Sequence, residues 1–251
     1  MNADADRPTF LLVHGAWHGA WCWEPVRAEL DADGWRSHAV DLPSANPPAG
    51  RPEGARPAGM LDDAAVIRES LRRIEGPVVV VAHSYGGVPT TEAISDAANV
   101  VRAVYVAAFQ LDAGESMFTF RGTPVPDDGA GQVPPHPDSR RLFFDDVPEA
   151  DAARATARLR PQAVRSFAER VTSAGWRTVP SSYVVCERDL VFDPSQQREL
   201  AARADSVHRL ASGHSPFLSM PRQLTDVLVE IAAPTLPAGA GARAAEPSLE
   251  G

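Results

Sequence analysis

A chain of 251 residues, 44% of them hydrophobic, is long enough for one large domain or for a core domain that carries an insertion. Its formal net charge of −9 argues against a nucleic-acid partner, because phosphate binding needs a basic surface, and the absence of lysine among its 24 basic residues excludes Schiff-base chemistry. Residues 1–8 are acidic and lack the apolar stretch of a secretory signal, and no apolar window of about 18 residues occurs, so we expect a cytoplasmic protein that does not enter a membrane.

Apolar strands alternate with amphipathic helices through the first 109 residues. Residues 61–74, for example, carry apolar side chains at helical spacing, whereas residues 43–59 are rich in Pro, Gly and Ala and indicate a long loop. Strands that alternate with helices at this interval are typical of βαβ units and a parallel sheet. The expected strands lie at 10–14, 37–40, 78–82 and 100–108, and the expected helices at 24–30, at 61–74 and from the third strand to about residue 98.

The alternation stops after Phe109. Residues 112–139 are rich in Gly, Pro and Asp, and residues 142–173 contain helical pieces with no strand between them. We therefore predict that residues 112–178 form a cap, or lid, inserted over the strand ends of an α/β core. The core would comprise residues 9–111 and 179–233, with strands at 182–186 and 207–210 and helices at 195–204 and 221–232, while residues 1–8 would form a flexible N-terminus and residues 234–251 a disordered tail.

The segment from Val78 to Gly87 is the most informative part of the chain. Four consecutive valines predict a buried strand of a parallel sheet, and this strand ends at Ser84, with small residues two positions before and after it. This is the layout of a nucleophile elbow, in which a sharp turn exposes a serine hydroxyl at the N-terminus of the next helix. Ala82 stands where glycine is usual in this motif, and the pair Gly86 and Gly87 keeps the other flank open. We interpret Ser84 as a nucleophile that attacks a carbonyl carbon.

A serine nucleophile needs a base, and the base needs an acid that orients it; in a sheet of this type they follow in the order serine, acid, histidine. His214 lies in a loop after the last strand, just before the helix that begins near Pro216, which places it at the same sheet edge as Ser84. Asp189 follows a strand by three residues and is the preferred acid. The alternatives for this acid are Glu187, Asp193 and Asp112.

Two backbone N–H groups are expected to stabilise the oxyanion that develops during attack. One belongs to Tyr85, directly after the nucleophile, and the other to Ala16, in the loop after the first strand. His83 is expected to be structural, because the strand points it away from the serine. His18 is a candidate for the substrate pocket. The two cysteines of the chain are too few for a disulfide framework and are expected to be buried thiols.

These motifs resemble those of the α/β-hydrolase superfamily, in particular the branch of plant methyl-ester esterases, hydroxynitrile lyases and bacterial pyrethroid-type carboxylesterases. The similarity extends from about residue 9 to residue 232, and the cap around residues 142–162 resembles bacterial members. It implies a mostly parallel sheet flanked by helices, with a helical cap inserted after the sixth strand. It also places Ser84, Asp189 and His214 at the triad positions, with Ala16 and Tyr85 at the oxyanion positions.

The lyases of this branch are a poor match. They carry a threonine where this chain has Gly15 and a lysine where it has Ser215, so the positive charge that would hold cyanide is missing. Cyanohydrin cleavage is therefore disfavoured.

The first hypothesis for function is a carboxylesterase-like serine hydrolase (EC 3.1.1) that cleaves esters of small apolar or aromatic substrates through an acyl-enzyme, with neither metal nor cofactor. One alternative is a secondary-metabolite enzyme on the same fold, a cyclase, decarboxylating enzyme or cofactorless oxygenase that uses the histidine as base without an acyl-enzyme. Another is a non-enzymatic ligand receptor. The expected partner is a small-molecule ester, and the expected state is a monomer or homodimer. The candidate pocket residues are Trp17, His18, Phe109, Phe118, Phe144 and Phe217.

Overall fold

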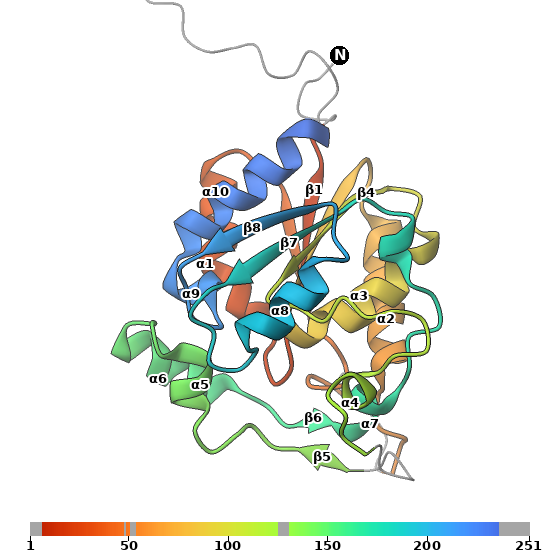
Figure 1. The fold of residues 1–251 in the computed structure, drawn as a ribbon, viewed down its shortest axis with the longest axis vertical. Coiled ribbons are helices and arrows are strands. Elements are labelled where there is room, and N and C mark those ends of the chain that lie inside the picture. The colour runs from red at the N-terminus through yellow and green to blue at the C-terminus, as the bar shows by residue number, and fades with distance from the viewer. Residues whose placement is uncertain (1–6, 48, 51–53, 125–130, 236–251) are drawn as a thin grey trace, which may run out of the picture.

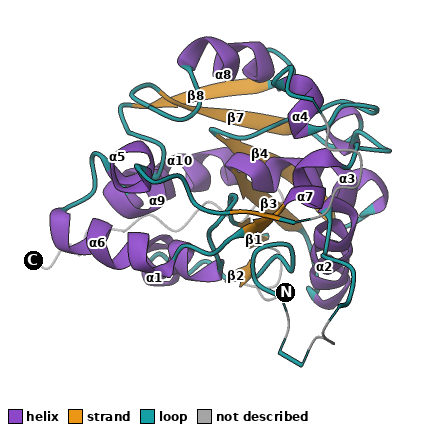
Figure 2. Ribbon diagram, turned by 90° about the horizontal axis from the view of Figure 1, so that it is seen from below, coloured by secondary structure: helices purple, strands orange, loops and turns teal. Residues whose placement is uncertain are grey.

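A six-stranded parallel sheet forms the centre of the molecule, with the strand order β2–β1–β3–β4–β7–β8 (Figures 1 and 2). The computed structural model describes residues 7–47, 49–50, 54–124 and 131–235. The strands are β1 (Thr9–Val13), β2 (Ser37–Val40), β3 (Val78–His83), β4 (Val100–Val106), β7 (Ser181–Cys186) and β8 (Ser206–Leu210). Each expected strand is present close to its predicted bounds, and the predicted parallel sheet is confirmed.

The central strands are buried on both faces. Every residue of β3 is buried, because helices cover both sides of a parallel sheet, and this explains its run of valines. In the register of the sheet, Ala82 lies opposite Val13 of β1 and Tyr105 of β4. The carboxyl ends of these three strands therefore lie side by side, and the loops that follow them meet at one edge.

Two groups of helices cover the two faces of the sheet. The first group contains α1 (Glu24–Ala32), α10 (Pro221–Ala232) and the short η1 (Ala20–Trp23) and α9 (Pro216–Ser219). The second contains α2 (Met60–Arg73), α3 (Gly87–Ala93) with η3 (Ile94–Asp96), and α8 (Pro194–Ala201). Figure 2 shows α1 and α10 on one side of the sheet, and α2 and α3 on the other. Side chains along β1 point alternately to the two faces of the sheet. Leu12 packs into the core under the first group of helices, and Leu11 packs into the core under the second group.

Residues 112–178 are here called the cap segment, and their described part lies outside this sheet. Their helices are α4 (Met117–Phe120), α5 (Ser139–Phe144), α6 (Glu149–Arg158), α7 (Val164–Ala168) and η4 (Gly175–Arg177). Their two strands, β5 (Gln132–Val133) and β6 (Gln162–Ala163), pair antiparallel. The elements α4 to α7, β5 and β6 lie at the bottom of Figure 1, whereas η4 lies beside α3. The sequence predicted no strand in the cap segment, since a strand of two residues shows no periodicity.

The position of the cap segment in the strand order also differs from expectation. It follows β4, the fourth strand of the sheet in chain order, and not a sixth strand, because only β1 to β4 precede it among the described residues. The division into core and cap at residues 112 and 178 stays a prediction.

The ends of the chain fall mostly outside the described residues. This applies to residues 1–6 of the expected flexible N-terminus and to residues 236–251 of the expected tail, while η5 (Ala233–Thr235) ends the described part. Cys22 and Cys186 are buried and free, as predicted. None of the helices in the described ranges is long and apolar enough to cross a membrane.

Candidate active site

A strained turn joins β3 to the helix that follows it. Ser84 has a φ of 50°, which is uncommon for a residue other than glycine and costs free energy that the surrounding structure must offset. Its carbonyl oxygen accepts a hydrogen bond from the Phe109 N–H at 3.1 Å. A Cβ at position 86 would lie 2.4 Å from the His14 carbonyl oxygen, so the turn requires glycine there. The chain continues through η2 (Ser84–Gly86) into α3, in the order of strand, turn and helix that the sequence predicted.

His214 and Asp189 form a buried pair at the same edge of the sheet. The His214 Nδ1–H donates to Asp189 Oδ2 at 2.7 Å, and the two side chains are 3% and 0% exposed. The other carboxylate oxygen, Asp189 Oδ1, accepts the N–H groups of Val191 at 2.7 Å and Phe192 at 2.9 Å. These bonds fix the carboxylate, and the carboxylate in turn leaves Nε2 of the imidazole free to accept a proton.

The alternative acids of the sequence analysis have other partners. Asp112 pairs with Arg177, and Glu187 lies 3.6 Å from an Arg209 nitrogen. Asp193 caps α8 by accepting the Ser195 N–H at 2.7 Å. Of the four candidates, Asp189 is therefore the one in contact with the histidine.

Two residues that the sequence analysis missed hold this pair in place. Gln197 of α8 donates from Nε2 to the Phe192 carbonyl at 2.8 Å and, at 3.3 Å, to Asp189 Oδ2. Asp146 of the cap segment accepts the N–H of Gly213, the residue before His214, at 2.6 Å. A glutamine on a short helix and an acid in a turn carry no sequence signal for such roles.

His83 brings His214 close to the serine turn. Its Nε2–H donates to the His214 carbonyl at 2.9 Å, and the two rings lie 4.6 Å apart. The described structure contains no hydrogen bond between the Ser84 hydroxyl and His214, and nucleophile–base bonds are often long without substrate. The pairing of these two residues is therefore part of the proposal below.

The loop after β1 approaches the serine closely. A Cβ placed on Gly15 would lie 3.0 Å from Ser84 Cβ, so only a residue without a side chain allows this approach. Ala16, the next residue, lines the same cavity as Ser84, and its N–H donates to no other group in the described structure. Tyr85 is the second residue of η2, where N–H groups lack an acceptor within the helix.

The cap segment holds this loop through Trp17. The Trp17 N–H donates to Gln162 Oε1 at 3.1 Å, its carbonyl accepts the Arg160 N–H at 2.8 Å, and its indole N–H donates to the Val133 carbonyl at 3.0 Å. Trp17 has a φ of 64°, in the left-handed region. Three polar contacts from the cap segment thus fix the residue that directly follows Ala16.

A buried polar network reaches Tyr85, the residue after Ser84. Asp63 Oδ2 accepts hydrogen bonds from the hydroxyls of Tyr85 and Ser44, both at 2.5 Å, and Gln162 Nε2 donates to the same Ser44 hydroxyl at 2.6 Å. Burial raises the pKa of Asp63 to about 7. The sequence did hold a signal, because Asp63 lies four residues before Ile67 and therefore on the buried face of α2.

Three other histidines near the site are buried and neutral. Burial lowers the pKa of His14 to about 4 and of His18 to about 3, and it holds that of His83 well below its ordinary value. His14 and His18 each donate from Nδ1 to a backbone carbonyl, at 2.7 Å in both cases. These side chains act as structural hydrogen-bond donors to the loop after β1 and to the turn of His214.

A cavity of about 360 Å³ opens at Ser84. Three of the six candidate pocket residues, Trp17, Phe109 and Phe118, line it, and most of its other lining side chains are apolar: Met117, Val133, Leu142, Phe143, Phe167, Leu190 and Val191. The polar side chains of the lining are Ser84, Arg121, Thr123 and His136.

The structure corrects the other three pocket candidates. His18, Phe144 and Phe217 are buried and do not line the cavity. The His18 ring packs against the rings of Phe144 at 5.7 Å and Phe217 at 5.9 Å, so these side chains fill the core instead. Aromatic type alone does not distinguish a core residue from a pocket residue.

The fold and site define a class of α/β protein whose reactive groups lie on loops at the carboxyl edge of a parallel sheet. Within that class, residues 10–227 match the model of the alpha/beta hydrolase family, and the chain belongs to this family. The resemblance inferred from the sequence motifs is therefore confirmed.

Several known proteins are similar to this chain over nearly its whole length. A protein named probable hydrolase R7, from Phoma sp., is 32% identical, covering 90% of this chain and 98% of its own. Methylesterase 3 of Arabidopsis thaliana is 26% identical, with 92% and 98% covered. Among solved structures, the methylesterase MES16 of Arabidopsis superimposes with a TM-score of 0.75 at 26% identity, covering 90% of this chain and 99% of that one. A pyrethroid hydrolase of Sphingobium faniae JZ-2, at 22% identity, has the same fold, with a TM-score of 0.75 and with 90% and 97% covered.

Proposed function

We propose that this protein is a serine esterase that hydrolyses carboxylic esters through an acyl-enzyme. The buried hydrogen bond of 2.7 Å between His214 and Asp189, next to the strained turn at Ser84, carries this proposal. The family membership and the relatives named as hydrolases and methylesterases support it.

The proposed reaction has two halves. As Ser84 Oγ forms a bond to the ester carbonyl carbon, His214 Nε2 takes the hydroxyl proton and then gives it to the departing alcohol. Water, deprotonated by the same imidazole, then attacks the acyl-enzyme carbonyl; as the bond to Ser84 Oγ breaks and the acid leaves, His214 returns the proton to Oγ. Asp189 keeps the imidazole oriented and stabilises its positive charge, and the N–H groups of Ala16 and Tyr85 stabilise the oxyanion.

The cavity favours small substrates with an apolar or aromatic portion. Its volume of about 360 Å³ and its lining of aromatic and aliphatic side chains suit a compact ester. The relatives do not favour the alternative of a secondary-metabolite enzyme that works without an acyl-enzyme.

Loss of the nucleophile tests the proposal. Ser84→Ala should abolish hydrolysis of p-nitrophenyl butyrate and labelling by a fluorophosphonate probe, because that probe reacts only with an activated serine. A circular dichroism spectrum identical to that of the wild type would show that the variant folds. Hydrolysis at the wild-type rate in folded Ser84→Ala, or no labelling of an active wild-type protein, would refute it.

We also propose a cytoplasmic location and a monomeric or homodimeric state. The two free cysteines are consistent with a reducing compartment. Cell fractionation tests the location, and light scattering on the purified protein tests the oligomeric state.

A further inference from the structure

Among the described residues that line the cavity at Ser84, one side chain is permanently charged, that of Arg121. Arg121 directly follows α4, and its guanidinium carbon lies 5.2 Å from the centre of the Phe109 ring and 6.0 Å from that of Phe192. These two rings stack on each other at 4.6 Å. The guanidinium thus lies against an aromatic wall of the cavity, where cation–π attraction holds it without using its N–H donors.

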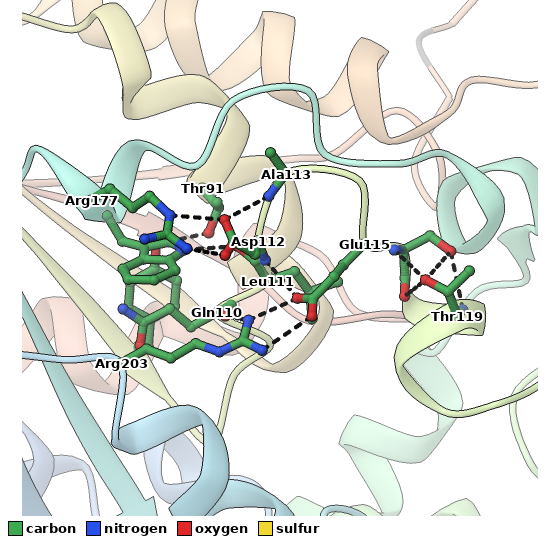
Figure 3. A network of polar contacts seen from close by, with 12 residues as sticks. Thr91, Gln110, Leu111, Asp112, Ala113, Glu115, Thr119, Arg177 and Arg203 are labelled. Carbon is green, nitrogen blue, oxygen red and sulfur yellow. Dashed lines mark hydrogen bonds and ion pairs between the residues drawn. The ribbon is translucent and has the colours of Figure 1, made fainter.

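Neighbouring arginines have carboxylate partners, whereas Arg121 has none among the described residues. Figure 3 shows that Asp112 pairs with Arg177 and that Glu115 pairs with Arg203, the latter through two contacts of 2.7 and 3.1 Å. These pairs engage the two carboxylates that precede α4 along the chain. Asp189, the acid of the buried pair, forms no ion pair with Arg121 but attracts its charge from a longer distance, and its carboxylate is hydrogen-bonded to His214.

His136 supplies a second donor in the same cavity. Its Nδ1 accepts the Asp138 N–H at 3.0 Å, so in the neutral ring the proton is on Nε2. Besides the hydroxyls of Ser84 and Thr123, the described lining of the cavity thus offers N–H donors from Arg121 and His136, and it contains no carboxylate.

We infer that Arg121 is an anion-recognition residue of this cavity, and that the preferred substrates are esters whose acid portion or alcohol portion carries a free carboxylate, such as monoesters of dicarboxylic acids. The planar guanidinium presents parallel N–H groups that match the two oxygens of a carboxylate. The apolar lining would hold the hydrocarbon part of the substrate between this charge and Ser84. This inference rests on the proposed esterase function of the same cavity.

Two substrates of similar size separate the inference from the proposed function. The neutral ester is p-nitrophenyl butyrate, and the anionic ester is mono-p-nitrophenyl succinate. The wild type should show the higher kcat/KM for the anionic ester, and added salt should reduce this preference by screening the ion pair. Arg121→Gln should lower kcat/KM for the anionic ester by about 10- to 100-fold, mainly through KM, and should change that for the neutral ester little. Arg72→Gln, on the exposed face of α2, is the matched control and should change neither value.

The outcomes are distinct. Equal kcat/KM for the two esters in the wild type, or an equal loss for both in Arg121→Gln, would overturn the anionic substrate class and leave the esterase function standing. Cleavage of neither ester by the wild type would instead contradict the proposed function. Because Arg121 forms no ion pair within the described chain, its replacement should leave the fold intact, and the retained activity on the neutral ester reports this directly.

Discussion

Asp63 gives this protein a pH-dependent stability that can be measured. Burial raises the pKa of its carboxyl group from 3.8 to about 7. Between these values the folded state keeps a proton that the unfolded chain has released, so the free energy of unfolding falls as the pH rises. The stabilising contribution of Asp63 is complete below pH 3.8, the pKa of the unfolded chain, and it is lost as the pH rises through about 7, the pKa of the folded state.

The size of the effect follows from the shift. One pKa unit corresponds to about 1.4 kcal/mol, so a shift of about three units amounts to about 4 kcal/mol over the whole range, and to about 2 kcal/mol between about pH 5 and about pH 7. Asp63→Asn removes the titration and keeps an acceptor oxygen. We expect the wild type to lose about this much stability relative to Asp63→Asn as the pH rises across that interval. Urea unfolding followed by tryptophan fluorescence at several pH values measures the difference.

Tyr85→Phe is the matched control for this experiment. It removes the hydroxyl that donates to Asp63 at 2.5 Å but retains the buried carboxyl group. Its stability should keep the wild-type slope against pH, at a lower overall value. Parallel profiles for the wild type and Asp63→Asn would refute the assignment of the pH dependence to this carboxyl group.

Two further predictions concern contacts between the cap segment and the site. Gln162→Leu removes the acceptor of the Trp17 N–H and thereby loosens the loop after β1. We expect kcat for p-nitrophenyl butyrate to fall about 10- to 100-fold with KM little changed. Gln162→Glu, which keeps an acceptor oxygen, should retain more activity. An unchanged kcat in folded Gln162→Leu would show that this contact does not position the loop. Asp146→Ala removes the acceptor of the Gly213 N–H and should lower kcat by about 10-fold, while Asp146→Asn, which retains an acceptor oxygen, should stay near the wild type. Equal kcat values for the two Asp146 variants would contradict this role.

The cap segment contributes to the site in two ways: its polar contacts hold neighbouring loops, and its helices α4, α5 and α7 supply side chains that line the cavity. Gln162 of β6 accepts from the Trp17 N–H and donates to the Ser44 hydroxyl, while Asp146 holds the loop of His214. These contacts reach both the loop after β1 and the loop after β8. The cap segment therefore forms part of the support of the candidate active site and, through Arg121, part of its wall.

The sequence determined the parts of this protein whose signals are local. The valine run of β3 predicted a buried parallel strand, because a strand covered on both faces needs apolar side chains throughout. Ser84 with its small flanking residues predicted the sharp turn, since larger side chains do not fit there. The strand–helix alternation placed Asp189 and His214 in loops at the edge where Ser84 lies, and the structure brings the acid and the histidine into contact.

Only the tertiary structure decided the parts that depend on which distant groups meet. Asp189, Glu187 and Asp193 all lie in the same loop region after β7, and the structure distinguishes Asp189 by its hydrogen bond to the His214 imidazole. The separation of pocket residues such as Phe118 from core residues such as Phe217 likewise follows from packing across the chain, because an aromatic ring is equally apolar in both places. Within the described residues Arg121 has no ion pair, whereas Arg177 and Arg203, far along the chain, pair with Asp112 and Glu115, and no local pattern records such a choice.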